Sequence, residues 1–269
     1  MSKLFRPDTL KPHARVGAPM APWEYVALED VDVKGALLVC GVPSLTSVGP
    51  VAAQFLVERL GMRVVGGFES DDLPPVGVAR GGLLTSPVQL WAAELACGPD
   101  GRCDRLLVLK SDVRLPPEQM APLASAVARL ARERAIALVV CLEGAPRSEL
   151  GGDVLVAASL KGLEFASRVE AKPVGERMLT GFHAPLLLRA NREGVPAIVL
   201  FSPLDEEADH GEAAASVLRV VGPLVPHVGL GSAELAKRAE QLHAEMKKDR
   251  REQELDAKLL EATNDPSYV

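Results

Sequence analysis

The sequence of 269 residues has few of the features that nucleic-acid-binding and membrane proteins require. Aromatic residues make up only 4% of the chain, the formal net charge is −6, and no stretch combines clustered basic residues with aromatic ones. Contacts to phosphates need clustered lysine and arginine, and base stacking needs aromatic rings, so we expect no nucleic-acid partner. No apolar run approaches the length of a membrane span, and we therefore expect no membrane partner.

Signatures of catalysis are also missing. The sequence contains no Gly-x-Ser-x-Gly nucleophile elbow, and no two of its five histidines have the spacing of a zinc site on a helix. The sequence therefore predicts a binding protein rather than an enzyme, without a cofactor or a metal.

One acidic stretch, Asp205 to His210, keeps an alternative open. Several carboxylates beside a histidine could hold a divalent ion or a proton. The same stretch immediately precedes a predicted helix, where carboxylates offset the positive end of the helix dipole in ordinary structural roles.

The four cysteines indicate a reducing compartment. Cys40 and Cys141 lie inside apolar runs and are predicted to be small buried core residues. Cys97 and Cys103 flank a turn at residues 98–102, where a reduced loop, a disulfide and a metal site are the alternatives. No apolar segment follows the N-terminal charges as in a secretion signal, so we expect a cytoplasmic protein.

Residues 1–30 are predicted to form a flexible, basic N-terminal arm. Its prolines prevent a regular helix. The charged side chains of its first part are Lys3, Arg6, Lys11 and Arg15, against Asp8 alone.

Residues 31–230 are predicted to form one α/β domain, because short apolar runs alternate with helical patterns. The predicted strands are 36–40, 63–68, 76–79, 106–109, 136–142, 154–157 and 197–201. The predicted helices are 51–60, 116–131, 179–192 and 213–221. This alternation predicts three α/β/α layers around a mixed, largely parallel sheet.

The loop after the first predicted strand is a candidate ligand or phosphate site. Gly41, Ser44, Thr46 and Gly49 lie between that strand and a helix, where α/β proteins bind phosphates on free backbone N–H groups. The loop lacks the Lys-Ser/Thr of a Walker motif and the glycine spacing of a dinucleotide site. A tight turn with hydroxyl caps is therefore the alternative to a phosphate site.

Residues 231–262 are predicted to form a charged helix, and residues 263–269 a docking tail. An apolar stripe of Leu235, Ala239, Leu242 and Met246 lies in the first half of the helix, so only that half can pack on the domain. The tail contains Tyr268, one of only two tyrosines in the chain, beyond the last residue expected in the core. An exposed aromatic side chain is a candidate contact for a partner.

Two blocks of sequence together resemble one known family. The first block consists of Gly41 to Gly49, Ala52-Ala53, Leu60-Gly61 and Asp72-Leu73-Pro74-Pro75. The second consists of Thr180-Gly181-Phe182, Gly194-Val195-Pro196-Ala197 and Glu212 to Leu218. In order and spacing they resemble the PAC2 family, named for a proteasome assembly chaperone, over roughly residues 36–224.

The resemblance implies a fold similar to purine nucleoside phosphorylases, no established catalysis, and a homo-oligomer that docks on the α-ring of the 20S proteasome. In archaeal relatives docking uses a C-terminal motif of a hydrophobic residue, a tyrosine and any residue. Tyr268 and Val269 match the last two positions, whereas Ser267 stands where the apolar residue belongs. The missing apolar side chain costs roughly 1.5 to 3 kcal/mol per tail, which several tails on one oligomer could recover through avidity.

Three hypotheses follow for the function. The first is a non-catalytic proteasome assembly chaperone or ATP-independent activator that binds through Ser267, Tyr268 and Val269. The second is a nucleoside- or phosphate-binding enzyme that uses the loop from Gly41 to Gly49. The third is an oligomeric PAC2 protein with no link to the proteasome.

Overall fold

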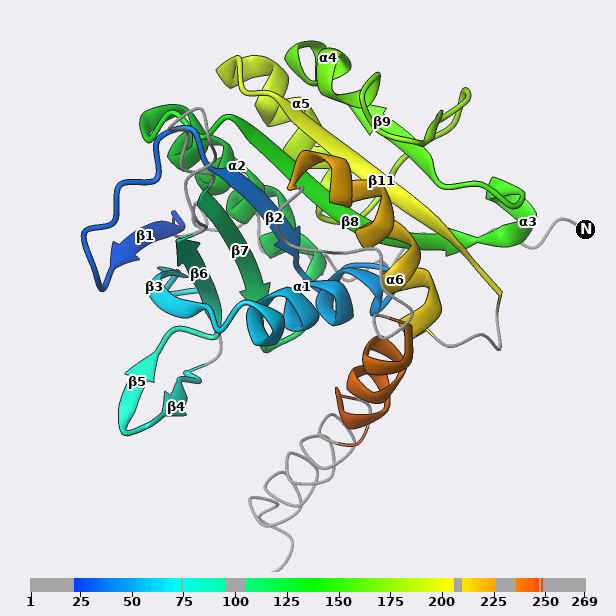
Figure 1. The fold of residues 1–269 in the computed structure, drawn as a ribbon. Coiled ribbons are helices and arrows are strands. Elements are labelled where there is room, and N and C mark those ends of the chain that lie inside the picture. The colour runs from blue at the N-terminus through cyan, green and yellow to red at the C-terminus, as the bar shows by residue number, and fades with distance from the viewer. Residues whose placement is uncertain are drawn as a thin grey trace, which may run out of the picture.

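A mixed sheet of nine strands forms the centre of the protein (Figure 1). The computed structural model describes residues 22–73, 75–94, 105–205, 210–225, 236–246 and 248. The strand order is β1-β3-β6-β7-β2-β8-β11-β9-β10, and the four central strands β7, β2, β8 and β11 are mutually parallel. β1, β3 and β6 add an antiparallel half on one side.

The strands of this sheet are β1 (Glu24–Ala27), β2 (Leu37–Gly41), β3 (Arg63–Glu69), β6 (Val88–Glu94), β7 (Arg105–Ser111), β8 (Leu138–Pro146), β9 (Leu155–Ala158), β10 (Lys172–Pro173) and β11 (Ala197–Leu204). A separate hairpin consists of β4 (Val78–Arg80) and β5 (Leu83–Thr85). The helices are α1 (Val48–Arg59), α2 (Pro117–Glu133), α3 (Arg147–Leu150), α4 (Leu163–Ala166), α5 (His183–Glu193) and α6 (His210–Val221), with 3-10 turns at Leu160–Gly162 and Gly222–Leu224.

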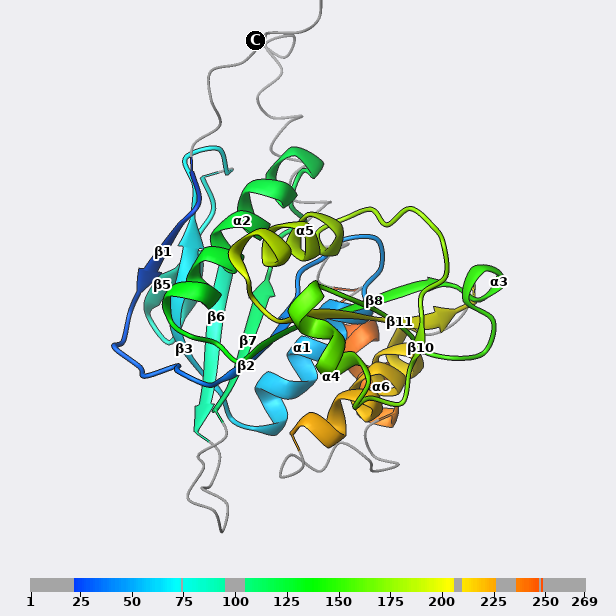
Figure 2. The ribbon, with the colours of Figure 1, turned by 90° about the horizontal axis from the view of Figure 1, so that it is seen from above.

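Helices cover both faces of the sheet, which confirms the predicted α/β/α layers. α2 and α5 pack together on one face and α1 and α6 on the other (Figure 2). Each face has its own apolar core, with Leu123 and Leu186 in the first and Leu56 and Leu218 in the second. The central strands are buried on both faces, as continuous apolar runs predict.

Both cysteines that were predicted to be buried are core residues. Cys40 on β2 and Cys141 on β8 are free thiols, 2% and 3% exposed, and the two residues are partners in the register of the two strands. Cys97 and Cys103 lie outside the described residues.

The predicted N-terminal arm is wrong beyond residue 21. Residues 24–27 form β1, which pairs antiparallel with β3. Trp23 is 1% exposed, and its indole N–H donates a hydrogen bond of 2.8 Å to Gln119 Oε1. The buried Trp23 fixes this part of the chain to α2. The prolines of the segment, on which the prediction of a flexible arm rested, did not indicate this contact.

Two further differences concern the ends and number of elements. β6 was not predicted, because Gln89 and the alanines that follow Trp91 interrupt its apolar pattern. α5 begins at His183 rather than at residue 179, because Gly181 has a positive φ of 84° that no helix accommodates.

Residues 236–246 form a helix that packs against α1 and α6, here called the C-terminal helix (Figure 1). Ala239 and Leu242 are 0% and 2% exposed, as the apolar stripe predicted. The rest of the predicted 231–262 helix, apart from residue 248, lies outside the described residues. Among the helices that the structure describes, none combines the length and the apolar character needed to cross a membrane.

Candidate functional site

The loop between β2 and α1 lies at the carboxyl ends of the parallel strands, where open α/β sheets bind their ligands. Gly41 and Gly49 allow the loop to pack closely on the sheet. A Cβ on Gly41 would lie 2.3 Å from Ala53 Cβ, and one on Gly49 would lie 2.4 Å from the backbone oxygen of Leu142. Both glycines therefore serve the approach of α1 to the sheet.

A buried carboxylate, that of Glu143 in the second half of β8, organises this loop. Its Oε1 accepts hydrogen bonds from Thr46 Oγ1 at 2.6 Å, from Thr46 N at 3.2 Å and from Gly144 N at 3.0 Å. Its Oε2 accepts one from Leu45 N at 3.4 Å. Burial raises the pKa of the Glu143 carboxyl, although these hydrogen bonds act in the opposite direction.

Four backbone N–H groups of the loop, those of residues 45–48, have partners within the chain. Those of Leu45 and Thr46 point to Glu143, that of Ser47 donates to His210 Nδ1 at 3.1 Å, and that of Val48 donates to Thr46 Oγ1 at 3.2 Å. A phosphate bound here would have to displace the Glu143 carboxylate. The loop therefore differs from a phosphate-binding loop, in which the backbone N–H groups are free to bind the anion.

Ser44 joins this loop to the segment before α5. Ser44 Oγ accepts a hydrogen bond of 3.0 Å from Phe182 N, and a Cβ on Gly181 would lie 2.0 Å from that oxygen. The two sequence blocks that resemble PAC2 thus meet in space. Arg114 adds a third segment, because its guanidinium donates to the backbone oxygen of Ser44 at 3.4 Å.

His183, the first residue of α5, lies beside Glu143 without a hydrogen bond to it. His183 Nδ1 is 3.8 Å from Glu143 Oε2, and its ring packs edge-on against Phe201 with 5.0 Å between centroids. Burial lowers the pKa of His183 to about 4, so the imidazole is neutral at pH 7. The pair is therefore not an ion pair at neutral pH.

A cavity of about 480 Å³ lies next to this network. It is bordered by Thr46, Gly144, His183 and Phe201 and by the segment 174–180, where Met178 is 93% exposed. Its volume is that of a small-molecule site. Thr46 Oγ1 donates to Glu143 and accepts from Val48 N and Gly144 N, so this hydroxyl holds the loop in place and is not a free nucleophile.

The acidic stretch does not converge on a cation in the part of the chain that is described. Asp205 is exposed and pairs with Arg147 at 2.9 Å, whereas His210 begins α6 and contacts Ser47. Residues 206–209 lie outside the described residues. Within the described ranges, no three His, Cys, Asp or Glu side chains form a group that could hold a metal ion.

Of the predicted site residues, the structure brings together Gly41, Ser44, Thr46 and Gly49. The tail residues Ser267, Tyr268 and Val269 lie outside the described residues. Glu143 and His183 were not predicted as site residues. The one signal for Glu143 was a carboxylate placed directly after the apolar run of residues 136–142.

The C-terminal helix is fixed to the domain by four kinds of contact. Arg238 pairs with Glu58 of α1 at 2.8 Å, and the ring of His243 stacks on that of His210 with 4.6 Å between centroids. A Cβ on Gly211 would lie 2.4 Å from the backbone nitrogen of Glu240, so the backbones of α6 and the C-terminal helix touch. Ala239 and Leu242 add the apolar contact.

Comparisons with known proteins agree with this fold. PbaA of Pyrococcus furiosus, an archaeal homologue of a proteasome-assembly chaperone, superposes with a TM-score of 0.65 at 22% identity, over 92% of this chain and 100% of its own. PbaB of the same organism, an archaeal proteasome activator, gives 0.64 at 17% identity, over 87% and 100%. A Thermoplasma acidophilum protein of unknown function gives 0.68 at 19% identity, over 85% and 91%.

No curated protein matches the sequence. The family model named PAC2 family matches residues 38–249, which is most of the chain and includes the loop, Glu143, His183 and the C-terminal helix. The chain belongs to the PAC2 family.

Proposed function

We propose that the protein is a non-catalytic proteasome assembly chaperone or ATP-independent activator, which docks on the α-ring of the 20S proteasome through Ser267, Tyr268 and Val269. Membership of the PAC2 family supports a role connected with the proteasome. Two structurally similar proteins are described as a proteasome-assembly chaperone homologue and a proteasome activator. Homo-oligomerisation and a cytoplasmic location are part of the proposal.

The observation that carries the proposal is the fixed base of the C-terminal segment. Arg238, Ala239 and Leu242 hold the C-terminal helix on α1 and α6, so the chain leaves the domain from a defined place. Fixing the position of a binding segment lowers the entropy that is lost when it binds. The segment that follows in sequence carries the tail.

In the proposed complex the ring of Tyr268 packs in a pocket between α-subunits, with its hydroxyl hydrogen-bonded. Because Ser267 supplies no apolar side chain, one tail binds weakly. Simultaneous binding of several tails on a homo-oligomer raises the affinity by about two to four orders of magnitude.

The experiment is a pull-down of purified 20S proteasome and of free α-rings. The intact protein is expected to retain them, whereas Tyr268→Ala and a chain without Tyr268 and Val269 are expected to lose them. Ser267→Leu should strengthen retention about tenfold. Asn264→Ala is the control within the same segment. Equal retention by the intact and truncated chains, with the oligomer unchanged in light scattering, would contradict the proposal.

Binding of a nucleoside or a phosphate is the second candidate function, and the cavity of about 480 Å³ beside Thr46 is the observation in its favour. Against it, Glu143 already accepts hydrogen bonds from the Leu45 and Thr46 N–H groups of the loop. A thermal-shift measurement with purine nucleosides and inorganic phosphate at millimolar concentration distinguishes the two functions, because a ligand that binds only the folded state raises Tm.

A further inference from the structure

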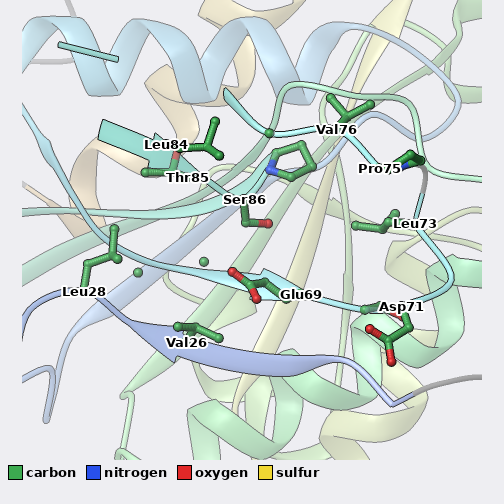
Figure 3. A pocket seen from close by; sticks show the side chains of 15 residues that line it. Val26, Leu28, Glu69, Asp71, Leu73, Pro75, Val76, Leu84, Thr85 and Ser86 are labelled. Carbon is green, nitrogen blue, oxygen red and sulfur yellow. The ribbon is translucent and has the colours of Figure 1, made fainter. Parts of the chain in front are cut away.

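A second cavity lies at the β1 edge of the sheet, between β1, the end of β3, the segment 69–77 and β5. It has a volume of about 590 Å³ and is open to solvent. Figure 3 shows the side chains that line this edge groove. Its aliphatic side chains are those of Val26, Leu28, Leu73, Val76 and Leu84, and Pro75 and Pro87 also line it.

The groove lies on a face of this part of the sheet that none of the described helices lines. α1 packs over β2, β7 and β8, and Gly66 and Gly67 of β3 line the groove without side chains. The ring of Tyr25 packs on Phe68 in the apolar core of the α2 side. Because neighbouring residues of a strand point to opposite faces, Val26 points into the groove (Figure 3). The side chains of Val26, Leu28, Val76 and Leu84 are 39%, 45%, 49% and 68% exposed, which is an apolar patch of the kind that marks a contact surface.

The rim of the groove is acidic. Glu69 and Asp71 line it, and no lysine, arginine or histidine does so. Glu24 is the strand partner of Glu69 in the β1–β3 register. In the part of the chain that is described, neither Glu69 nor Asp71 makes an ion pair. The groove therefore combines an apolar floor with at least two uncompensated negative charges.

We propose that the edge groove binds the N-terminal segment of the same chain, residues 1–21. The segment carries Lys3, Arg6, Lys11 and Arg15 against Asp8, and its large apolar residues are Leu4, Phe5, Leu10, Val16 and Met20. Basic and apolar side chains are what an acidic rim and an apolar floor select. No nucleic acid or membrane is needed to explain the cluster of positive charge.

The connection between segment and groove supports this choice of occupant. Residue 21 is followed by Pro22 and by the buried Trp23, and β1 begins at Glu24, directly beside the acidic rim. An extended chain covers about 3.3 Å per residue, so a few residues after a turn suffice to follow the four residues of β1. Gly17, Pro19 and Pro22 supply turn-forming residues at the required place.

Two kinds of interaction are available to the segment. Apolar side chains fill the space between Leu28 and Leu84, while the basic ones approach Glu69 and Asp71. The outer edge of β1 has no strand partner within the described residues, so its backbone groups are also available. A short tether gives an effective concentration in the millimolar range, so weak individual contacts are sufficient for occupancy.

The first test is photo-crosslinking in the full-length protein, with benzoylphenylalanine in place of Phe5, Leu10 or Val16 in three separate variants. Mass spectrometry is expected to identify crosslinks to residues 69–77 or 84–87 of the same chain. Mixing ¹⁵N-labelled and unlabelled protein shows which chain supplies the segment. Crosslinks to other surfaces, or between isotopically different copies, would overturn the proposal in favour of another site or a second copy.

The second test measures the rate of tryptic cleavage after Arg15. The double variant Glu69→Gln with Asp71→Asn removes the acidic rim without adding a cleavage site, and we expect cleavage to become about fivefold faster. Glu164→Gln with Glu170→Gln changes the net charge equally at exposed positions far from the groove in sequence. Equal rates in the two double variants would overturn the proposal. Neither test involves the proteasome, so its outcome is independent of tail docking.

Discussion

The loop after β2 and the edge groove both have carboxylates beside glycines. The two regions differ in how far these carboxylates are buried and in whether the fold supplies their partners. Glu143 is 3% exposed and accepts four hydrogen bonds from within the chain. Glu69 is exposed and makes no ion pair within the described residues. A buried carboxylate with all its partners supplied by the fold contributes to structure. An exposed one without partners beside an apolar surface is available for a contact.

The largest expected effect is the loss of stability when the Glu143 carboxylate is removed, and the same change at Glu69 is the comparison. Glu143→Ala would leave the part-buried N–H groups of Leu45 and Thr46 and the Thr46 hydroxyl without their acceptor, while Gly144 N keeps its bond to Thr46 Oγ1. We expect the free energy of unfolding to fall by about 3 to 5 kcal/mol. Glu69→Ala, the matched change at the groove, should alter it by less than about 0.5 kcal/mol. Urea unfolding of both variants measures the two changes in the free energy of unfolding. Equal changes would show that the two carboxylates do not differ in their contribution to stability.

The second prediction concerns pH. Because the folded protein holds the pKa of His183 at about 4, below the ordinary 6.5, the folded state binds fewer protons than the unfolded one between these values. Stability should therefore fall as the pH decreases from 6.5 to 4, by up to about 3 kcal/mol. His183→Phe is expected to remove this part of the pH dependence of stability. Glu143, with its raised pKa, contributes with the opposite sign and is present in both proteins, so the difference between them isolates His183.

The third prediction concerns the base of the C-terminal helix. Gly211→Ala forces the methyl group against the backbone nitrogen of Glu240, at 2.4 Å in the present geometry. We expect the helix to shift or detach at a cost of about 2 kcal/mol. Proteolysis within residues 236–246 should become faster, while hydrogen exchange in β2 and β8 stays slow. Protection of the C-terminal helix equal to that of the unsubstituted protein would show that the close backbone contact is not required.

The smallest effect is expected at the surface ion pair of the same helix. Arg238→Ala removes the contact with Glu58, but the Arg238 side chain is 39% exposed, so the loss should be below about 1 kcal/mol. High salt should reduce the difference further. Thermal unfolding at low and high ionic strength measures it. A larger, salt-independent loss would show that the arginine stem, rather than its charge, holds the helix.

The sequence predicted the central part of the fold because its signals are local. Continuous apolar runs marked β2 and β8, and the stripe containing Ala239 and Leu242 marked the helix face that packs on the domain. β1 was missed because its place in the sheet depends on its pairing with β3, roughly 40 residues later in the chain. The anchor of that segment, Trp23 on Gln119, spans an even larger separation of 96 positions.

The site was harder to predict than the fold for the same physical reason. Glu143 binds Thr46 across 97 positions of sequence, and Ser44 binds Phe182 across 138. Each residue alone is an ordinary turn or strand residue, and only the folded chain brings them together. The family resemblance contained part of this information, since its two blocks proved to be neighbours in space.

The contact between Gly211 and Glu240 has a geometrical consequence for anything that lies beyond the C-terminal helix. The 11 described residues of that helix rise by about 16 Å along its axis. A tilt of about 10° at its base would move its far end by about 3 Å, which is comparable with the size of a side-chain pocket. In an assembly of several copies, the spacing between C-terminal segments would thus depend on the absence of a single methyl group in α6.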